Sequence, residues 1–246
     1  MEHPFARTEI LLGTAAVKKL AAARVAIFGL GGVGSYVAEA LARSGIGYLS
    51  LIDHDRVTPS NLNRQLLAML DTLGQLKVDV MARRIEGINP AAVVETYPVF
   101  YRPSKGGELV QPGYDYIVDA LDTVAAKVDL ITRSRKLGTP IISCMGTGNR
   151  LDPECFRVAD ISASHTCPLA RVMRRELRRR GIVEGVKVVF STELPLKPCA
   201  KVMEGQVADR NGKEIIGSMA FVPPVAGFIL AGVVVRGILE IGEKGR

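Results

Sequence analysis

Short apolar runs alternate with longer helix-like segments along the first two-thirds of this 246-residue chain. Apolar strands that are separated by helices are typical of a parallel sheet covered on both faces. The pattern therefore predicts an α/β fold, namely a Rossmann-like, doubly wound and mainly parallel sheet with helices on both faces. The predicted strands are 24–28, 48–52, 93–97, 116–118 and 140–144, and the predicted helices are 32–44, 75–88 and 125–137.

The pattern changes after residue 145. Residues 146–168 carry scattered polar residues and are predicted to form a loop. A strongly basic helix is predicted over 169–180, where six arginines accompany a single acid, and a further strand is predicted over 186–190. Residues 191–217 are predicted to be an irregular excursion. The sheet is therefore expected to carry a loop-rich and helical extension at its C-terminal side.

The longest apolar run, 219–235, contains Pro223 and Pro224 and is slightly short for a membrane span. We predict a buried helix that begins at the prolines, with membrane association as the alternative. No basic region followed by an apolar stretch opens the chain, so no signal peptide is predicted and the expected location is cytoplasmic. The whole chain, 1–246, is predicted to be one domain, with its sheet-forming part at about 20–145 and a further part at about 146–246.

The composition gives two further observations, one on net charge and one on cysteines. The formal net charge is +7, which favours an anionic partner, although solubility alone explains an excess of this size. The four cysteines include no pair separated by two residues, so reduced thiols are expected rather than a zinc site or disulfides. Cys144 ends an apolar run and is expected to be buried. Cys167 lies in a polar loop and is a candidate reactive thiol.

A glycine-rich turn follows the first predicted strand. It spans Gly29–Gly34 and leads into a predicted helix, while Asp53 ends the second strand. Glycines let the backbone approach phosphates, the helix N-terminus favours an anion, and an acid at that point usually holds ribose hydroxyls. A bound nucleotide is therefore predicted, with a glycine turn without ligand as the alternative. At this point NAD and ATP remain equally compatible. The predicted phosphate contacts are Gly29, Gly31, Gly32 and Gly34.

Charged residues further along the chain are expected at the same edge of the sheet. Arg64 and Lys77 would neutralise a triphosphate and the charge that develops as pyrophosphate leaves. Asp119 and Asp122 follow the fourth strand, where a carboxylate can hold magnesium. Taken singly, Lys77 could be a solvated helix residue and Asp122 a helix N-cap.

Taken together, these motifs resemble the ubiquitin-activating-enzyme superfamily, which includes the ThiF, MoeB and HesA adenylyltransferases. The shared signature is the glycine loop, Asp53-His54-Asp55, Asn61-Leu62-Asn63-Arg64-Gln65, Lys77 and Asp122, in that order. The resemblance implies ATP and Mg²⁺ as cofactors and adenylation of a substrate carboxylate. It assigns the ribose to Asp53, the magnesium to Asp122 and the lining of the nucleotide site to Asp55, Asn61, Arg64, Gln65 and Lys77.

The same resemblance suggests a homodimer. Arg7 matches the N-terminal arginine with which family members reach the ATP of the partner subunit. The residues expected to act in catalysis are then Arg7, Arg64, Lys77 and Asp122.

The last third of the chain departs from the sulfur-carrier activators, because the paired Cys-x-x-Cys zinc site is missing. Residues 160–172, the basic helix and residues 221–227 resemble the bacterial tRNA threonylcarbamoyladenosine dehydratases. This resemblance implies that the carboxylate of a modified adenosine in tRNA is adenylated and then cyclised with loss of water. It also implies one ThiF-type adenylation domain over 1–246, with the nucleotide-binding part at about 20–145 and the part that faces substrate and tRNA at about 146–246. The arginines of 169–180 would contact RNA, with a solvated helix face as the alternative. Cys167 lies roughly where related enzymes carry a thioester cysteine, but an intramolecular second step needs no thiol.

Three other functions remain as alternatives. An activator of a ubiquitin-like sulfur-carrier protein would use the same ATP site, an NAD-dependent oxidoreductase would explain only the glycine loop and Asp53, and an RNA-binding protein would retain the fold without catalysis. A monovalent cation (Na⁺ or K⁺) near 191–217 and sulfur-transfer proteins as partners are left open.

Overall fold

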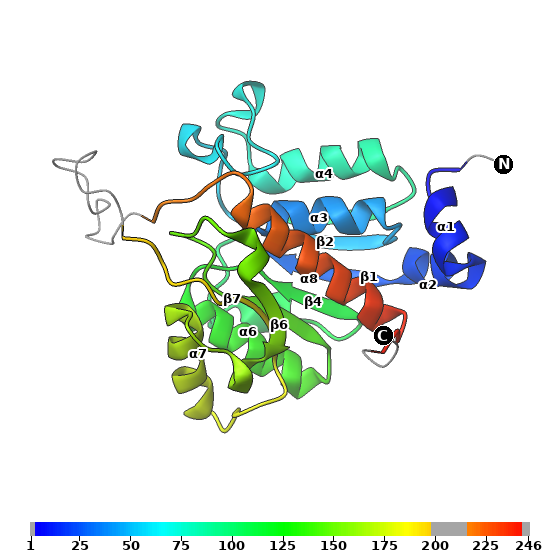
Figure 1. Cartoon of the computed structure of the whole chain (residues 1–246). Helices are drawn as coiled ribbons and strands as arrows, with labels where there is room; N and C mark the ends of the chain where they lie inside the picture. Colours follow the sequence, from blue (N-terminus) through cyan, green and yellow to red (C-terminus); the bar gives the residue numbers. More distant parts are fainter. Residues whose placement is uncertain (1–2, 198–215, 243–246) are drawn as a thin grey trace.

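A seven-stranded sheet runs through the molecule, and the computed structural model describes residues 3–197 and 216–242 of it (Figure 1). The strand order is β3-β2-β1-β4-β5-β7-β6, and all neighbours are parallel except β6, which runs antiparallel to β7. The strands are β1 (Arg24–Phe28), β2 (Tyr48–Ile52), β3 (Val93–Tyr97), β4 (Tyr116–Asp119), β5 (Ile141–Cys144), β6 (Phe156–Asp160) and β7 (Lys187–Ser191).

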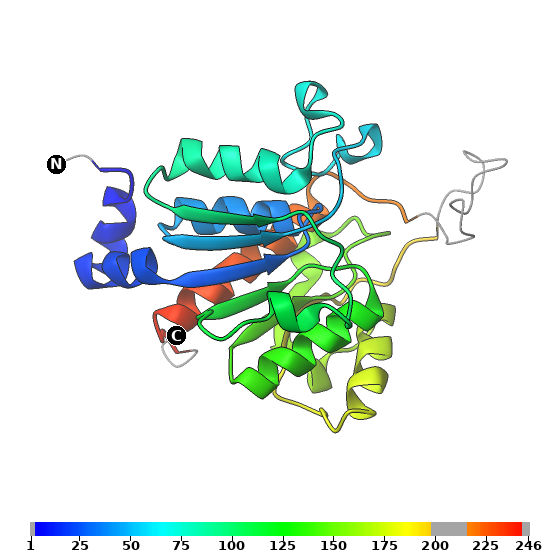
Figure 2. The ribbon, with the colours of Figure 1, turned by 180° about the vertical axis from the view of Figure 1, so that it is seen from behind.

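Helices cover both faces of this sheet (Figures 1 and 2). Buried side chains of α3, α4 and α8 form one apolar core, and those of α5, α6 and α7 form a second. Strand β1 shows how one strand serves both, since Val25 and Ile27 belong to the first core and Ala26 and Phe28 to the second. The helices are α1 (Ala6–Leu12), α2 (Thr14–Ala22), α3 (Gly34–Arg43), α4 (Lys77–Ile88), α5 (Gly106–Leu109), α6 (Val124–Leu137), α7 (Pro168–Arg178) and α8 (Val222–Ile238).

The predicted α/β class and the predicted strands are confirmed, but the loop predicted over 146–168 is wrong. That segment contains β6 (Phe156–Asp160), which forms one edge of the sheet. Only Phe156 of this strand is fully buried, and the polar Arg157 and Asp160 break the apolar pattern that identified the inner strands. The N-terminal helices α1 and α2 were not expected either, because they bury little more than Leu20.

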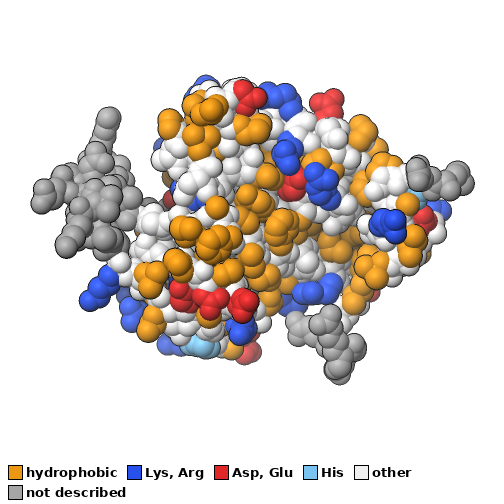
Figure 3. Space-filling model, turned by 45° about the horizontal axis from the view of Figure 1, so that its top comes forward, with side chains coloured by type: hydrophobic (Ala, Val, Ile, Leu, Met, Phe, Trp, Pro, Cys, Tyr) orange, Lys and Arg blue, Asp and Glu red, His pale blue; other side chains and the backbone are white. Residues whose placement is uncertain are grey.

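Helix α8 explains the apolar run near the C-terminus. It packs against α3 on one face of the sheet, and most of its side chains are buried. Among the helices that the structure describes, none is long and apolar enough to cross a membrane. Part of α8 remains at the surface, where Phe228 meets the ring of Tyr36 edge-on at 5.7 Å. Figure 3 shows this side of the molecule, with apolar side chains gathered between charged ones.

The order in which strands are added changes direction between the neighbouring strands β1 and β4. Strands β1, β2 and β3 follow one another outward on one side, and β4, β5 and β7 follow outward on the other. The loops after β1 and β4 therefore diverge, which opens the crevice where doubly wound sheets bind ligands. The glycine loop follows β1, and Asp122 follows β4.

The contact between α8 and α3 can be tested at a glycine. A Cβ atom on Gly227 would lie 2.6 Å from the carbonyl oxygen of Val33, whereas a Cβ on Gly232 of the same helix would meet nothing within 4 Å. We expect Gly227→Ala to lower the free energy of unfolding by about 1–3 kcal/mol through overpacking. Gly232→Ala should leave it unchanged or raise it by up to about 1 kcal/mol. Urea denaturation of both variants measures the difference, and equal values would contradict the close helix contact.

Candidate functional site

The glycine loop is folded tightly against the end of β4. Gly29 has a φ of +92°, and a Cβ there would lie 2.7 Å from the carbonyl oxygen of Ala120. A Cβ on Gly34 would overlap the carbonyl oxygen of Gly29. The loop therefore requires glycine at these two positions for its own geometry. Helix α3 begins at Gly34, directly after the turn, and the N-terminus of a helix offers N–H groups and a partial positive charge to an anion.

Asp53 fastens the end of β2 to this loop. Its Oδ2 accepts a hydrogen bond from the Leu30 N–H at 2.6 Å, and its Oδ1 accepts one from the Asp55 N–H at 2.8 Å. Both carboxylate oxygens keep a further lone pair. The predicted ribose contact of Asp53 is compatible with this position, and the carboxylate has a structural role in addition.

The segment Asn61–Gln65 lies beside the loop. Asn61 is buried, and its Oδ1 accepts a hydrogen bond from the Thr58 N–H, which closes the short helix at Pro59–Asn61. The Arg64 guanidinium donates to the carbonyl of Ser60 and to Oδ1 of Asn63, both at 2.8 Å. Burial lowers the pKa of Arg64. Asn61 thus holds the segment in shape, and Arg64 reaches the crevice.

Arg64 and Gln65 meet two different glycines. A Cβ on Gly32 would lie 3.5 Å from Cγ of Arg64, and a Cβ on Gly31 would lie 3.9 Å from Nε2 of Gln65. Gln65 is buried, and its Oε1 has no hydrogen-bond partner among the described residues. An orphaned buried acceptor next to a phosphate-type loop fits a ligand that supplies a donor there.

The Lys77 side chain is buried, so it is not a solvated helix residue. It is the first residue of α4, its side chain is 5% exposed, and its Nζ lies 2.7 Å from Oδ2 of Asp55. Its backbone N–H also donates to the Asp55 carbonyl at 3.0 Å. Asp55 and Lys77 are therefore brought together near Asp53, where they neutralise each other.

The two aspartates after β4 differ completely. Asp119 is fully buried and pairs with Nζ of Lys127 at 2.9 Å, and it also accepts hydrogen bonds from Ser143 and from the Leu121 N–H. Its predicted availability for magnesium is therefore wrong, since Lys127 and Ser143 occupy it. Asp122 is exposed, and among the described residues its carboxylate accepts a hydrogen bond only from the Thr123 hydroxyl. An exposed monodentate carboxylate at this edge is the donor that Mg²⁺ accepts.

Arg7 lies away from this crevice within its own chain. Its helix, α1, follows Phe5, which packs on Gly45 just beyond the end of α3. The glycine loop stands at the other end of α3, a helix of ten residues and thus about 15 Å long. Figure 1 shows α1 at the opposite end of the sheet from the start of α3. Any contact of Arg7 with a nucleotide would therefore involve a second copy.

The arginines of α7 are not equivalent. The Arg174 guanidinium donates to the carbonyl and the hydroxyl of Ser164 at 2.6 Å, so it supports the preceding loop. Arg175 and Arg179 pair with Glu176 at the surface. Arg171 and Arg178 are exposed, and neither has a side-chain partner among the described residues.

The thiols offer no exposed nucleophile in the part of the chain that the structure describes. Cys167 is 1% exposed, and this burial argues against the reactive thiol that its polar loop allowed. Cys144 is buried as expected, and burial raises its pKa to about 12. Cys155 is partly exposed, and its Sγ is hydrogen-bonded to Asp152. Cys199 falls outside the described residues.

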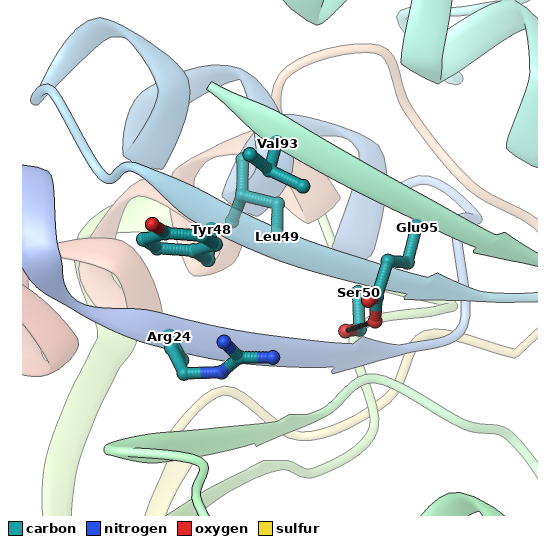
Figure 4. Close-up of a pocket in the computed structure, with 6 residues that line it drawn as sticks. All are labelled: Arg24, Tyr48, Leu49, Ser50, Val93 and Glu95. Atoms are coloured by element: carbon teal, nitrogen blue, oxygen red, sulfur yellow. Dashed lines mark hydrogen bonds between the residues drawn. The ribbon is translucent and has the colours of Figure 1, made fainter. Parts of the chain in front are cut away.

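A hollow at the opposite edge of the sheet is separate from this site (Figure 4). It lies over the starts of β1, β2 and β3, where the Arg24 guanidinium stands 5.0 Å from the centroid of the Tyr48 ring. Ser50 donates to the Glu95 carboxylate at 3.1 Å across it. These side chains satisfy one another, and the crevice beside the glycine loop remains the candidate site.

A glycine loop at a topological switch point, with Arg64, Lys77 and the exposed carboxylate of Asp122 at the same edge of the sheet, defines a nucleotide-binding α/β domain. A family model described as the ThiF family matches residues 5–245. The chain belongs to the ThiF family, which confirms the resemblance found in its motifs.

Individual relatives match over most of the chain. The tRNA threonylcarbamoyladenosine dehydratase of Bacillus subtilis (strain 168) is 43% identical over 98% of this chain and 96% of its own length. The Escherichia coli (strain K12) protein of the same description is 39% identical over 79% of this chain and 75% of its own length. The crystal structure of E. coli TcdA in complex with ATP superposes with a TM-score of 0.86 at 33% identity, covering 98% of this chain and 96% of that one.

Because Asp119 is buried and paired and Asp122 is exposed, their replacement should change the free energy of unfolding by different amounts. Asp119→Ala leaves the Lys127 ammonium buried without its partner, and we expect a loss of about 3–5 kcal/mol in the free energy of unfolding. Asp122→Ala, the matched control, should change it by no more than about 0.5 kcal/mol because the side chain is exposed. Chemical denaturation of both variants measures this. A combined Asp119→Ala, Lys127→Met variant should recover stability, and its failure to do so would argue against the unpaired Lys127 ammonium as the cause of the loss.

Proposed function

We propose that this protein is an ATP-dependent tRNA threonylcarbamoyladenosine dehydratase. The observation that carries the proposal is the 43% identity to a protein of that description over nearly the whole of both chains, including the segments after β5. The site geometry supports it, because the glycine loop, Arg64, Gln65 and Asp122 lie at one edge of the sheet. The protein is accordingly an ATP-binding, adenylating enzyme.

The reaction follows from these positions. A carboxylate oxygen of the threonylcarbamoyl group attacks the α-phosphorus of ATP, and the bond to pyrophosphate breaks. Arg64 and Lys77 neutralise the charge that develops on the departing pyrophosphate, and the glycine-loop N–H groups orient the phosphates. Lys77 must turn from Asp55 to the nucleotide. An internal nucleophile of the modification then attacks the acyl carbon, and AMP leaves with the carboxylate oxygen that is formally lost as water.

The residue roles at the nucleotide are part of the proposal. Asp53 holds the ribose, Asn61 and Gln65 line the pocket, and Asp122 would hold Mg²⁺, which supplies positive charge at the phosphates when bound. The orphaned Oε1 of Gln65 and the free carboxylate of Asp122 support this fit. No thiol is assigned a step, because Cys167 is buried and the second nucleophile comes from the substrate.

A homodimer, in which Arg7 contacts the nucleotide of the partner copy, is also proposed. The position of α1 far from the glycine loop of its own chain supports this arrangement. We place the enzyme in the cytoplasm, where its tRNA substrate resides. A monovalent cation near 191–217 and sulfur-transfer partners stay predictions, and most of that segment lies outside the described residues.

Activation of a ubiquitin-like sulfur-carrier protein is the second candidate, since it would use the same ATP site. It predicts ATP–pyrophosphate exchange that depends on a carrier protein rather than on tRNA. An NAD-dependent oxidoreductase has no use for the cations beside the glycine loop, and a non-catalytic RNA-binding protein would release no AMP. Measuring the nucleoside mass and AMP release with modified tRNA separates the dehydratase from the other three functions.

We expect purified protein with ATP, Mg²⁺ and tRNA that carries threonylcarbamoyladenosine to yield a nucleoside lighter by one water, with release of AMP and pyrophosphate. Asp122→Ala should lower AMP formation by at least about a hundredfold while the variant stays folded, because a magnesium ligand is removed and little packing changes. Mass spectrometry of digested tRNA and an AMP assay report both results. An unchanged nucleoside mass with the wild-type protein would refute the dehydratase, and normal turnover in the variant would refute the role of Asp122.

Helix α7 gives a separate prediction for tRNA binding. Arg171, Arg175 and Arg178 share one exposed face, so replacing all three with alanine should weaken tRNA binding. The salt dependence should flatten by about 0.7–0.9 in log–log slope for each phosphate that the protein no longer neutralises. Arg174 is left intact because it supports Ser164.

The charge-matched control replaces Lys18, Lys105 and Arg236, which are exposed elsewhere on the molecule. A filter-binding titration between about 50 and 200 mM salt distinguishes the two triple variants. If the salt dependence of tRNA binding were equal in the two triple variants, the arginine face of α7 would be only a solvated surface.

A further inference from the structure

The guanidinium of Arg150 is buried, and most of its donor atoms are unpaired. Arg150 is 4% exposed and lies in the loop after β5. Its Nη1 donates to the Gly148 carbonyl at 3.0 Å, while Nε and Nη2 have no partner among the described residues and are closed off from solvent. No described acid pairs with it. A buried charge without an opposite charge is costly, so a site of this kind calls for an anion.

The free edge of Arg150 has the shape of a carboxylate receptor. Nε–H and Nη2–H point in parallel from one side of the guanidinium plane and can engage two oxygens at once. Arg84 uses the same edge in this protein, with Nε 2.7 Å from Oε2 of Glu39 and Nη2 3.0 Å from Oε1. The edge on Arg150 is therefore chemically matched to a carboxylate or to two phosphate oxygens.

The loop that carries Arg150 is fixed on both sides. The Asn149 N–H donates to the Gly217 carbonyl at 2.8 Å, and Oδ1 of Asn149 accepts from the Gly217 N–H at 2.7 Å. On the other side, the N–H groups of Leu151 and Asp152 donate to the Glu193 carboxylate at 3.0 and 3.1 Å. The guanidinium is thus held by its backbone and not by a salt bridge, which suits a preorganised binding group.

The loop that carries Arg150 lies at the same edge of the sheet as the nucleotide crevice. The loop follows β5, which pairs with β4, and β4 ends just before Asp122. The segment after Gly217 continues the contact, since the Ser218 carbonyl accepts from Nδ2 of Asn63, and the next residue, Arg64, lies beside Gly32. Arg64 therefore lies beside the loop that follows β1, and Arg150 lies in the loop that follows β5.

We propose that Arg150 binds the carboxylate of the acyl substrate and so distinguishes modified from unmodified tRNA. The inference rests on the proposed function. The phosphates already have Arg64, Lys77 and the glycine loop, so the remaining anion of the reaction is the carboxylate that becomes adenylated. A fully desolvated guanidinium would place that carboxylate with two directed hydrogen bonds.

Binding assays with defined probes test this assignment. Wild-type protein should bind tRNA with threonylcarbamoyladenosine at least about tenfold more tightly than unmodified tRNA, as expected for a charged hydrogen-bonded pair. Arg150→Gln should lose this preference, raise KM for the modified tRNA by a similar factor, and keep the wild-type affinities for ATP and for unmodified tRNA. Arg150→Lys should also lose most of the preference because it lacks the fork. Arg157→Gln, an exposed arginine on β6, is the charge-matched control.

Two further measurements keep the outcomes separate. Arg150→Met should not lower Tm, and a fall of several degrees would assign Arg150 to the internal structure instead and overturn the proposal. The free modified nucleoside and its methyl ester are then compared by equilibrium dialysis, in which wild-type protein should bind the acid, whereas Arg150→Gln should bind neither.

These outcomes also separate the inference from the proposed function. If the wild-type protein binds the acid through Arg150 yet dehydrates no tRNA, the proposed function fails and the carboxylate site stands. If Arg150→Gln keeps its preference for the acid and for modified tRNA, the inference is wrong. A fall in ATP affinity with that preference retained would instead make Arg150 a phosphate ligand and overturn the carboxylate assignment.

Discussion

The ion pair between Asp119 and Lys127 lies beneath the whole site. Neither side chain reaches solvent, and the pair is completed by Ser143 from β5 and by the N–H and carbonyl of Leu121. Removing two charges from water is costly, and the structure offsets this with one Coulombic contact and several hydrogen bonds. The result joins β4, β5 and the first turn of α6 just below the loop that carries Asp122. Because Gly29 packs on Ala120 in that loop, the ion pair also fixes the floor of the glycine loop.

The cations above that floor are held in different ways. Lys77 is neutralised by Asp55, Arg64 donates to neutral oxygens, and Arg150 has no anionic partner among the described residues. In the proposed roles, a nucleotide would replace Asp55 at Lys77 but would engage Arg64 without breaking an ion pair. Such a graded arrangement separates binding from catalysis, because a group that is already paired contributes most where new negative charge develops.

The sequence predicted the inner sheet well because buried parallel strands are short apolar runs, and those runs coincide with β1, β2 and β3 over their whole lengths. It failed at β6, where an edge strand is half-exposed and carries Arg157 and Asp160. The site was predictable as a set of residues, since motif order survives folding. Their states were not, because burial of Cys167, the pairing of Lys77 with Asp55 and the pairing of Asp119 with Lys127 all depend on how the chain folds around them. Arg150 gave no sequence signal for the same reason.

The two sides of the crevice differ in how freely their residues can change, and this affects which substrates the fold can take. The β1 side supplies a phosphate site whose glycines are required by backbone overlap at Gly29 and Gly34, so it tolerates little change whatever the acyl substrate is. The β5 side is built from loops that are held by Glu193 and Gly217, and such loops can vary without disturbing the sheet. An adenylating domain can therefore keep one activation chemistry and change its carboxylate substrate after β5. In this chain the arginine-rich α7 and the isolated guanidinium of Arg150 both follow that point, and together they suit a polyanion that presents a single carboxylate.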